Sequence, residues 1–223
     1  TTLFRSELID HVGQYKDLKF PAQLTDAPEM VLRGGCVGIQ KMEYLPGRGV
    51  YEYPYTPESF PWFYDKEQWI KYLDMLVENR MNSLYLWNGH PFASLVKLEE
   101  YPFAVEVDEE TFKKNEEMFS FLTAEADKRG IFVIQMFYNI LLSKPFAEHY
   151  GLKTQDRNRP ITPLVSDYTR KSVAAFIEKY PNVGLLVCLG EAMDTYEDDV
   201  EWFTKTIIPG VKDGLKALGR TDE

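Results

Sequence analysis

Residues 69–90, WIKYLDMLVENRMNSLYLWNGH, contain the pattern that decides the fold. Their first part repeats apolar side chains at helical spacing, which predicts an amphipathic helix over about 66–80. Asp65 is a suitable N-cap for this helix, and Gln68 follows three positions later, as in a capping box. The run SLYLW at 83–87 predicts a strand that ends in a polar loop. A helix, a strand and a polar loop in direct succession form the repeating unit of an α/β protein.

The same unit recurs along the rest of the chain. Strands are predicted over 30–40 (MVLRGGCVGIQ), 131–137 (IFVIQMF) and 183–189 (VGLLVCL). Further helices are predicted at about 109–129, 144–150 and 167–180. A last helix is predicted to begin near Asp194, which caps it, and to break or kink at Pro209 and Gly210. The continuous apolar run at 131–137 is typical of a strand covered on both faces. Alternation of buried strands with amphipathic helices predicts a parallel sheet.

The predicted fold class is therefore α/β, a parallel (β/α) barrel of TIM type of which about four units are seen. A complete barrel of eight units takes about 250 residues, and the chain has 223. We expect residues 1–29, with a short helix at 2–12, to be a linker or the end of a preceding domain. Residues 30–223 are expected to be a truncated barrel domain. The alternative is a complete, open α/β sheet.

Residues 44–63, YLPGRGVYEYPYTPESFPWF, interrupt this alternation. The segment is rich in Pro, Gly and Tyr and has no periodicity, which predicts a long loop. Long loops in compact domains are functional or disordered, and the aromatic content of this segment argues against disorder.

Composition excludes several classes of partner. The formal net charge is −10 and the isoelectric point is about 4.9, so the surface repels nucleic acids and anionic membranes. No apolar run approaches the roughly 18 residues of a membrane span. Cys36 and Cys188 both lie in strand-like segments and are predicted to be buried thiols. The cysteine and histidine spacings indicate no structural metal site.

Glu191 is the strongest candidate for chemistry. It follows Gly190 directly after the apolar strand at 183–189, and active residues of parallel α/β proteins gather at the carboxyl ends of strands. Partial desolvation there raises the pKa of a carboxyl group toward the range of a general acid. The alternative is a structural role at the start of the following helix.

Other polar residues follow the strands in the same way. Gln40 and Lys41 follow the first, and the predicted ligand-contacting residues that follow or end the next two are Trp87, Asn88, His90, Tyr138 and Asn139. Loop capping is the alternative for the polar members. Arg33 is predicted to lie within the first strand, where an arginine needs a ligand or a carboxylate partner. The chain has no GxSxG elbow and no P-loop, and RGGCVG departs from the dinucleotide-binding spacing, so no cofactor and no metal are expected.

The segments RGG, WIKYLDMLVENRMNSLYLWNGH, AEADKRGIFVIQMFYN and LVCLGEAM resemble the first half of a glycoside-hydrolase barrel. The layout over about 30–193 is similar to that of α-glucuronidases and family 20 hexosaminidases. The resemblance implies that Glu191 is the general acid at the end of strand four and that Arg33 binds the sugar. It also implies that a second carboxylate and the remainder of the barrel come from a later part of the same protein. Hexosaminidases have Asp-Glu where this chain has Gly190 and Glu191, which favours the α-glucuronidase-like alternative.

The sequence leaves three functions to compare. The first is a glycosidase that acts on a carbohydrate substrate, which favours a secreted or periplasmic location. The second is a non-catalytic carbohydrate-binding or scaffold domain. The third is another barrel enzyme, such as a lyase or aldolase, for which Lys41 is the one nearby lysine.

Overall fold

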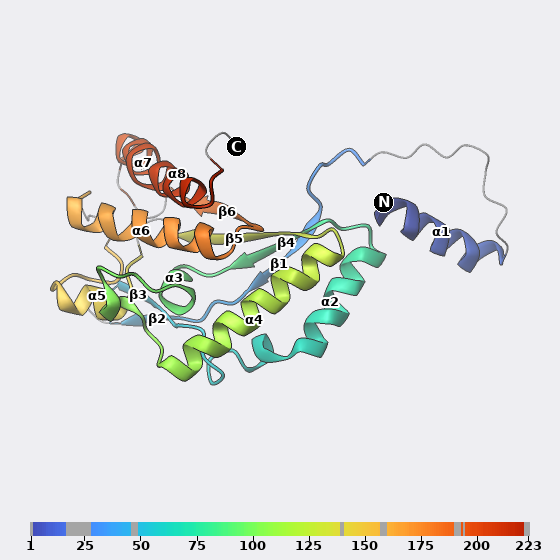
Figure 1. Cartoon of the computed structure of the whole chain (residues 1–223), viewed down its shortest axis with the longest axis horizontal. Helices are drawn as coiled ribbons and strands as arrows, with labels where there is room; N and C mark the ends of the chain where they lie inside the picture. Colours follow the sequence, from blue (N-terminus) through green and yellow to red (C-terminus); the bar gives the residue numbers. More distant parts are fainter. Residues whose placement is uncertain are drawn as a thin grey trace.

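The computed structural model describes residues 2–16, 28–45, 49–138, 141–156, 160–189, 193 and 195–220. Its centre is a four-stranded parallel sheet (Figure 1). The strands, in spatial order, are β1 (Gly34–Gly38), β4 (Ser83–Trp87), β5 (Phe132–Tyr138) and β6 (Val183–Cys188). The α/β class and the parallel sheet are confirmed. The spatial order of these four strands is the same as their order along the chain.

Helices connect and cover the strands. The long ones are α2 (Lys66–Glu78), α4 (Glu109–Lys128), α6 (Pro163–Lys179) and α8 (Ile208–Ala217). Shorter helices are α3 (Phe92–Leu95), α5 (Lys144–His149) and α7 (Tyr196–Trp202), with 3-10 turns η1 (Pro61–Tyr64) and η2 (Pro102–Ala104). An N-terminal helix, α1 (Thr2–Tyr15), stands to one side of this body (Figure 1), and Asp10 pairs with Arg80 at 2.6 Å. No helix in the described ranges has the length and apolar character of a membrane span.

The predicted loop at 44–63 was wrong in part. It overlaps an antiparallel hairpin of β2 (Met42–Leu45) and β3 (Gly49–Glu52). Beyond the hairpin, the aromatic side chains of Tyr55, Phe60 and Phe63 are buried in the core. The part of the segment that follows the hairpin is therefore held in place by its packed rings.

The two faces of the sheet differ. Side chains alternate between the faces along each strand, and Leu84, Leu86, Val133 and Phe137 on the covered face are at most 1% exposed. The covered face packs on the helices, and a Cβ added at Gly35 on this face would meet Tyr72 and Leu76 of α2.

The opposite face, here called the bare face, carries a mixed set of apolar and aromatic side chains. Within the described part of the chain, Phe132 is 45% and Leu186 38% exposed, and Tyr85, Trp87, Met136 and Tyr138 are partly exposed. The expectation that residues 131–137 are covered on both faces was wrong for the described structure, because Phe132 and Met136 on the bare face are exposed or partly exposed.

Some helix ends agree with the sequence prediction and others differ. Asp65 caps α2 and accepts from the Gln68 amide at 3.0 Å, as predicted. Helix α6 begins at Pro163, four residues before the predicted start, because Thr162 caps it. Helix α7 is capped by Thr195, which accepts from the Asp198 amide at 3.1 Å, and the predicted cap, Asp194, lies outside the described residues.

Pro209 does not end the last helix. The residues before it, Phe203–Ile207, form a π turn in which the Ile208 amide donates to the Phe203 carbonyl, and α8 then continues through Pro209 to Ala217. A proline lacks the amide donor that the regular ladder needs, and the wide turn accommodates this loss. The helix is therefore not broken at Pro209 and Gly210, and the predicted break or kink takes the form of a local widening.

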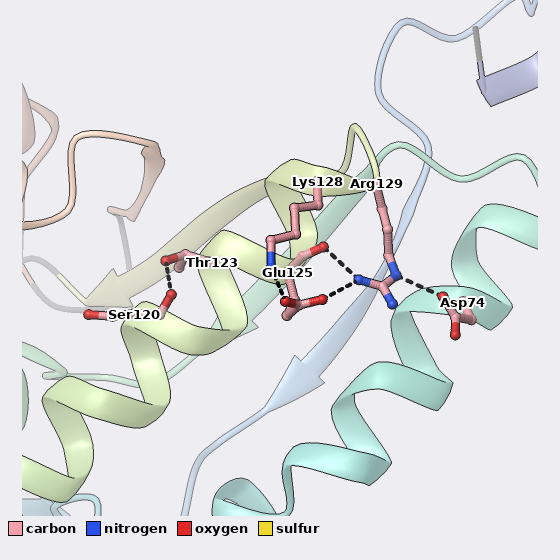
Figure 2. Close-up of polar contacts among 6 residues, drawn as sticks. All are labelled: Asp74, Ser120, Thr123, Glu125, Lys128 and Arg129. Carbon is pink, nitrogen blue, oxygen red and sulfur yellow. Dashed lines mark hydrogen bonds and ion pairs between the residues drawn. The ribbon is translucent and has the colours of Figure 1, made fainter.

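Helices α2 and α4 are joined by the guanidinium of Arg129 (Figure 2). Its Nε donates to Asp74 of α2 at 2.7 Å, and its Nη1 donates to the Glu125 carboxylate at 2.7 Å and to the Glu125 carbonyl at 3.0 Å. Lys128 pairs with the same carboxylate. One arginine thus holds the end of α4 against its neighbour.

Replacing Arg129 with Ala is expected to lower the free energy of unfolding by about 1 kcal/mol. A single partly exposed ion pair stabilises a protein only slightly, but Arg129 connects several charged groups in a network. Lys128→Ala is the control, because its side chain is 68% exposed and it makes a single pair; its effect should stay under about 0.5 kcal/mol. Denaturant unfolding measures both. Equal losses for the two variants would contradict the bridging role of Arg129.

Candidate functional site

The carboxyl ends of the four parallel strands lie at one edge of the sheet, where ligands of such sheets bind. Strand β4 ends at Trp87 and β5 at Tyr138, so the structure brings Trp87, Asn88, His90 and Tyr138 to the same edge. The chain leaves β6 at this edge two residues before Gly190. Two predicted site residues, Glu191 and Asn139, lie outside the described residues.

Trp87 and Tyr138 form an aromatic pair on the bare face. Their ring centroids are 5.0 Å apart and the rings meet edge to face at 66°. The indole Nε1 of Trp87 donates to Oε1 of Gln40 at 2.6 Å, which joins the end of β4 to the residues after β1. Both rings are partly exposed. The arrangement offers aromatic surface beside a fixed polar group, which is the composition of a small-ligand site.

The Asn88 side chain joins the end of β4 to the residues that follow β1. Its Nδ2 donates to the Ile39 carbonyl at 2.7 Å, and its Oδ1 accepts from the His90 amide at 2.8 Å. The side chain is 1% exposed. These contacts are those of a loop cap, the alternative considered for this residue, and its predicted ligand contact stays a prediction.

His90 is buried between the sheet and α6. Its Nε2 lies 2.8 Å from the Tyr168 hydroxyl, and its ring packs edge to face on Phe92 at 5.7 Å. Burial lowers the pKa of His90 from 6.5 to about 3, so the imidazole is neutral at physiological pH. His90 is neutral and only 8% exposed, which favours a structural role in the loop. Its direct contact with a sugar stays a prediction.

The depressed pKa of His90 predicts a dependence of stability on pH. Below pH 6.5 the unfolded chain binds a proton at this site while the folded chain does not, so stability falls as pH drops from 6.5 toward 3, by at most about 1.4 kcal/mol per pH unit. Unfolding at pH 7 and pH 5 measures this loss, and a His90→Gln variant should lose less stability on acidification. An identical acid loss in the variant would show that His90 does not cause it.

Arg33 is not brought together with these residues. It precedes β1, at the amino end of the sheet, whereas the prediction placed it within the strand. Its Nη1 donates to the Met30 carbonyl at 2.6 Å and its Nε to the Arg80 carbonyl at 3.1 Å. The partners are main-chain oxygens, so the expected salt bridge with a carboxylate is not seen. The position before β1 also keeps Arg33 away from the ligand edge. Arg33 fixes the entry of the chain into the sheet.

The cysteines differ from the sequence prediction. Cys36 is exposed and Cys188 is partly exposed, and neither forms a disulfide within the described part of the chain. Cys36 lies on the bare face, opposite the covered positions that its neighbours in β1 occupy. Among the residues that the structure describes, no group of three or more His, Cys, Asp or Glu side chains could hold a metal ion.

Two residues of the site, Tyr168 and Gln40, were not predicted from the sequence to have a specific role there. Tyr168 lies 78 positions from its partner His90, and a tyrosine near the start of an amphipathic helix gives no signal beyond core packing. Ser143 lowers the pKa of Tyr168 by hydrogen bonding, against the larger raising effect of burial. Gln40 had been noted only for following the first strand.

The chain is similar to one part of a much longer enzyme. A solved structure described as a "GH138 enzyme targeting pectin rhamnogalacturonan II" matches it with a TM-score of 0.93 and 82% sequence identity. The match covers 98% of this chain and 25% of that chain, so this chain spans a quarter of the length of that glycoside hydrolase. No protein-family model matches the chain, and no curated protein matches it significantly.

Proposed function

We propose that this chain is part of the catalytic domain of a glycoside hydrolase that acts on the pectic polysaccharide rhamnogalacturonan II. The observation that carries the proposal is the 82% identity over 98% of the chain to an enzyme described as having that target. At such identity the two segments share their fold and most of their side chains. The earlier resemblance to α-glucuronidases and family 20 hexosaminidases is a finer proposal, for which this match gives no separate support.

The architecture supports a barrel built in part by this chain. Four parallel strands follow one another in chain order, and a barrel winds in this way, with every helix outside and one face of the sheet turned inward. The apolar bare face is the surface that the inside of a barrel requires. Residues 30–223 would supply four units, and the remaining units would come from the rest of the same protein, with residues 1–29 leading into the domain.

The proposed chemistry belongs to Glu191. As general acid it donates a proton to the glycosidic oxygen of the scissile bond, while a second carboxylate from another part of the protein acts as nucleophile or base. Trp87 and Tyr138 are proposed to contact the sugar, since their part-exposed rings lie at the same strand-end edge.

The experiment that tests the proposal is to incubate the intact protein with rhamnogalacturonan II and analyse the released sugars by chromatography and mass spectrometry. Release of a defined sugar supports the proposal. Binding of the polysaccharide without release would favour the non-catalytic alternative, and neither binding nor release would reject both.

A further inference from the structure

Building on the proposed function, we propose that Gln40 is a positioning residue that fixes the Trp87 indole as a platform for one sugar ring of the substrate, and that this ring enters beside Gly38.

The Trp87 ring is held at two points. Its Nε1 donates to Gln40 Oε1 at 2.6 Å, which sets the rotation of the side chain. The backbone is fixed by the next residue, Asn88, whose side-chain amide donates to the Ile39 carbonyl at 2.7 Å. Gln40 directly follows Ile39, so both bonds join the same two segments, the ends of β1 and β4. A ring fixed before the ligand arrives loses little conformational entropy on binding.

The space around the platform is open on one side. Tyr138 meets the ring edge to face at 5.0 Å and closes the β5 side. On the β1 side, Gly38 is the register partner of Trp87, and a Cβ added at Gly38 would meet no described atom within 4 Å. The lack of a side chain at position 38 therefore leaves room beside Trp87 on the bare face.

A sugar ring is the occupant whose chemistry fits. A pyranose has a C–H face, which packs on an aromatic face, and a rim of hydroxyls, which need polar neighbours. The net charge of −10 disfavours nucleic acids, whose bases also stack on aromatic rings. The similarity to a pectin-targeting enzyme supplies the class of sugar polymer.

The first test is a double-variant cycle in the intact protein with rhamnogalacturonan II oligosaccharides. Gln40→Leu removes the acceptor, and Trp87→Phe keeps an aromatic face but removes the donor. Each is expected to raise KM about tenfold with kcat changed less than about threefold, and the double variant should be no worse than Trp87→Phe. Multiplying effects, or a fall in kcat with KM unchanged, would overturn the positioning role. Gln14→Leu on the exposed surface of α1 is the matched control.

The second test fills the open space. Gly38→Leu is expected to raise KM at least about tenfold and to leave the melting temperature within about 2 °C of the wild type, because a Cβ at this position meets no described atom within 4 Å. An unchanged KM, or a large fall in melting temperature that shows another part of the protein in that space, would overturn the entry side.

The proposed function can fail separately. If the intact protein binds the oligosaccharides but does not cleave them, calorimetric dissociation constants replace KM in both tests. Weaker binding by Gln40→Leu and Gly38→Leu then supports the platform although the enzyme proposal is wrong. Unchanged dissociation constants in these variants overturn the platform, whether or not the protein is an enzyme.

Discussion

Changing Glu191 to Gln in the intact protein is expected to lower kcat on rhamnogalacturonan II about a thousandfold. General acid catalysis contributes about 10²- to 10⁴-fold, and glutamine has nearly the same shape as glutamate but carries an amide in place of the acidic proton. KM should change little, since the variant keeps the size and hydrogen-bonding capacity of the side chain. Initial rates over a range of substrate concentrations measure both constants.

The leaving group supplies a sharper readout. The leaving group of an activated aryl glycoside departs without being protonated. The fall in kcat for Glu191→Gln should therefore be much smaller on such a substrate than on the polysaccharide. Glu197→Gln is the matched control, because Glu197 lies in the exposed first turn of α7 and its loss should leave kcat unchanged. Equal losses on both substrates would remove Glu191 from the role of acid, and full activity would remove it from the mechanism.

Changing Gly214 to Ala is expected to lower the free energy of unfolding by about 2 kcal/mol, because the extra carbon overpacks a helix contact. In α8, a Cβ at Gly214 would lie 2.8 Å from both the Ala174 carbonyl oxygen and the Ile177 Cβ of α6. Neither atom is the end of a flexible side chain, so the helices would have to separate. Gly210, one turn earlier, would bring a Cβ to 2.7 Å from the Arg170 carbonyl.

Gly13 in α1 provides the control for this substitution. A Cβ there meets no described atom within 4 Å, so Gly13→Ala should stabilise the helix by up to about 1 kcal/mol through backbone entropy alone. Opposite signs for the two glycines, measured by denaturant unfolding, are the expected outcome. A stabilising effect of Gly214→Ala would mean that α6 and α8 are not in close contact in solution.

The sheet and the main helices could be predicted because their patterns are local. The strand at 83–87 was placed at its observed bounds, and the Asp65 cap was identified from a four-residue motif. The hairpin of β2 and β3 was missed because its strands have four residues each, too few for alternation to be recognised. The exposure of Phe132 was missed because an apolar run does not tell which face a neighbouring element covers.

The sequence predicted which edge of the sheet carries the site, but not the contacts that its side chains make. The rule that ligands bind at the carboxyl ends of strands correctly gathered Trp87, Asn88 and Tyr138. It could not show that the Asn88 side chain donates a hydrogen bond to the Ile39 carbonyl, because the two residues are 49 positions apart in the sequence. Arg33 was misplaced because a pattern locates a strand only to within a few residues, and one residue decides whether a side chain precedes the sheet.

The order of the strands has a consequence for biosynthesis. Each new strand pairs with one already made, so its partner has left the ribosome before it emerges, and β1 can serve as the template on which the sheet lengthens. The paired residues lie 49 or 50 positions apart, as in Gly34 with Ser83 and Val133 with Val183, so each pairing must wait for the intervening helix, and such long-range parallel pairing is slow. In the barrel proposed above, the edge of β6 would be an open template until a later strand pairs with it, and at this stage the nascent chain would depend most on chaperones.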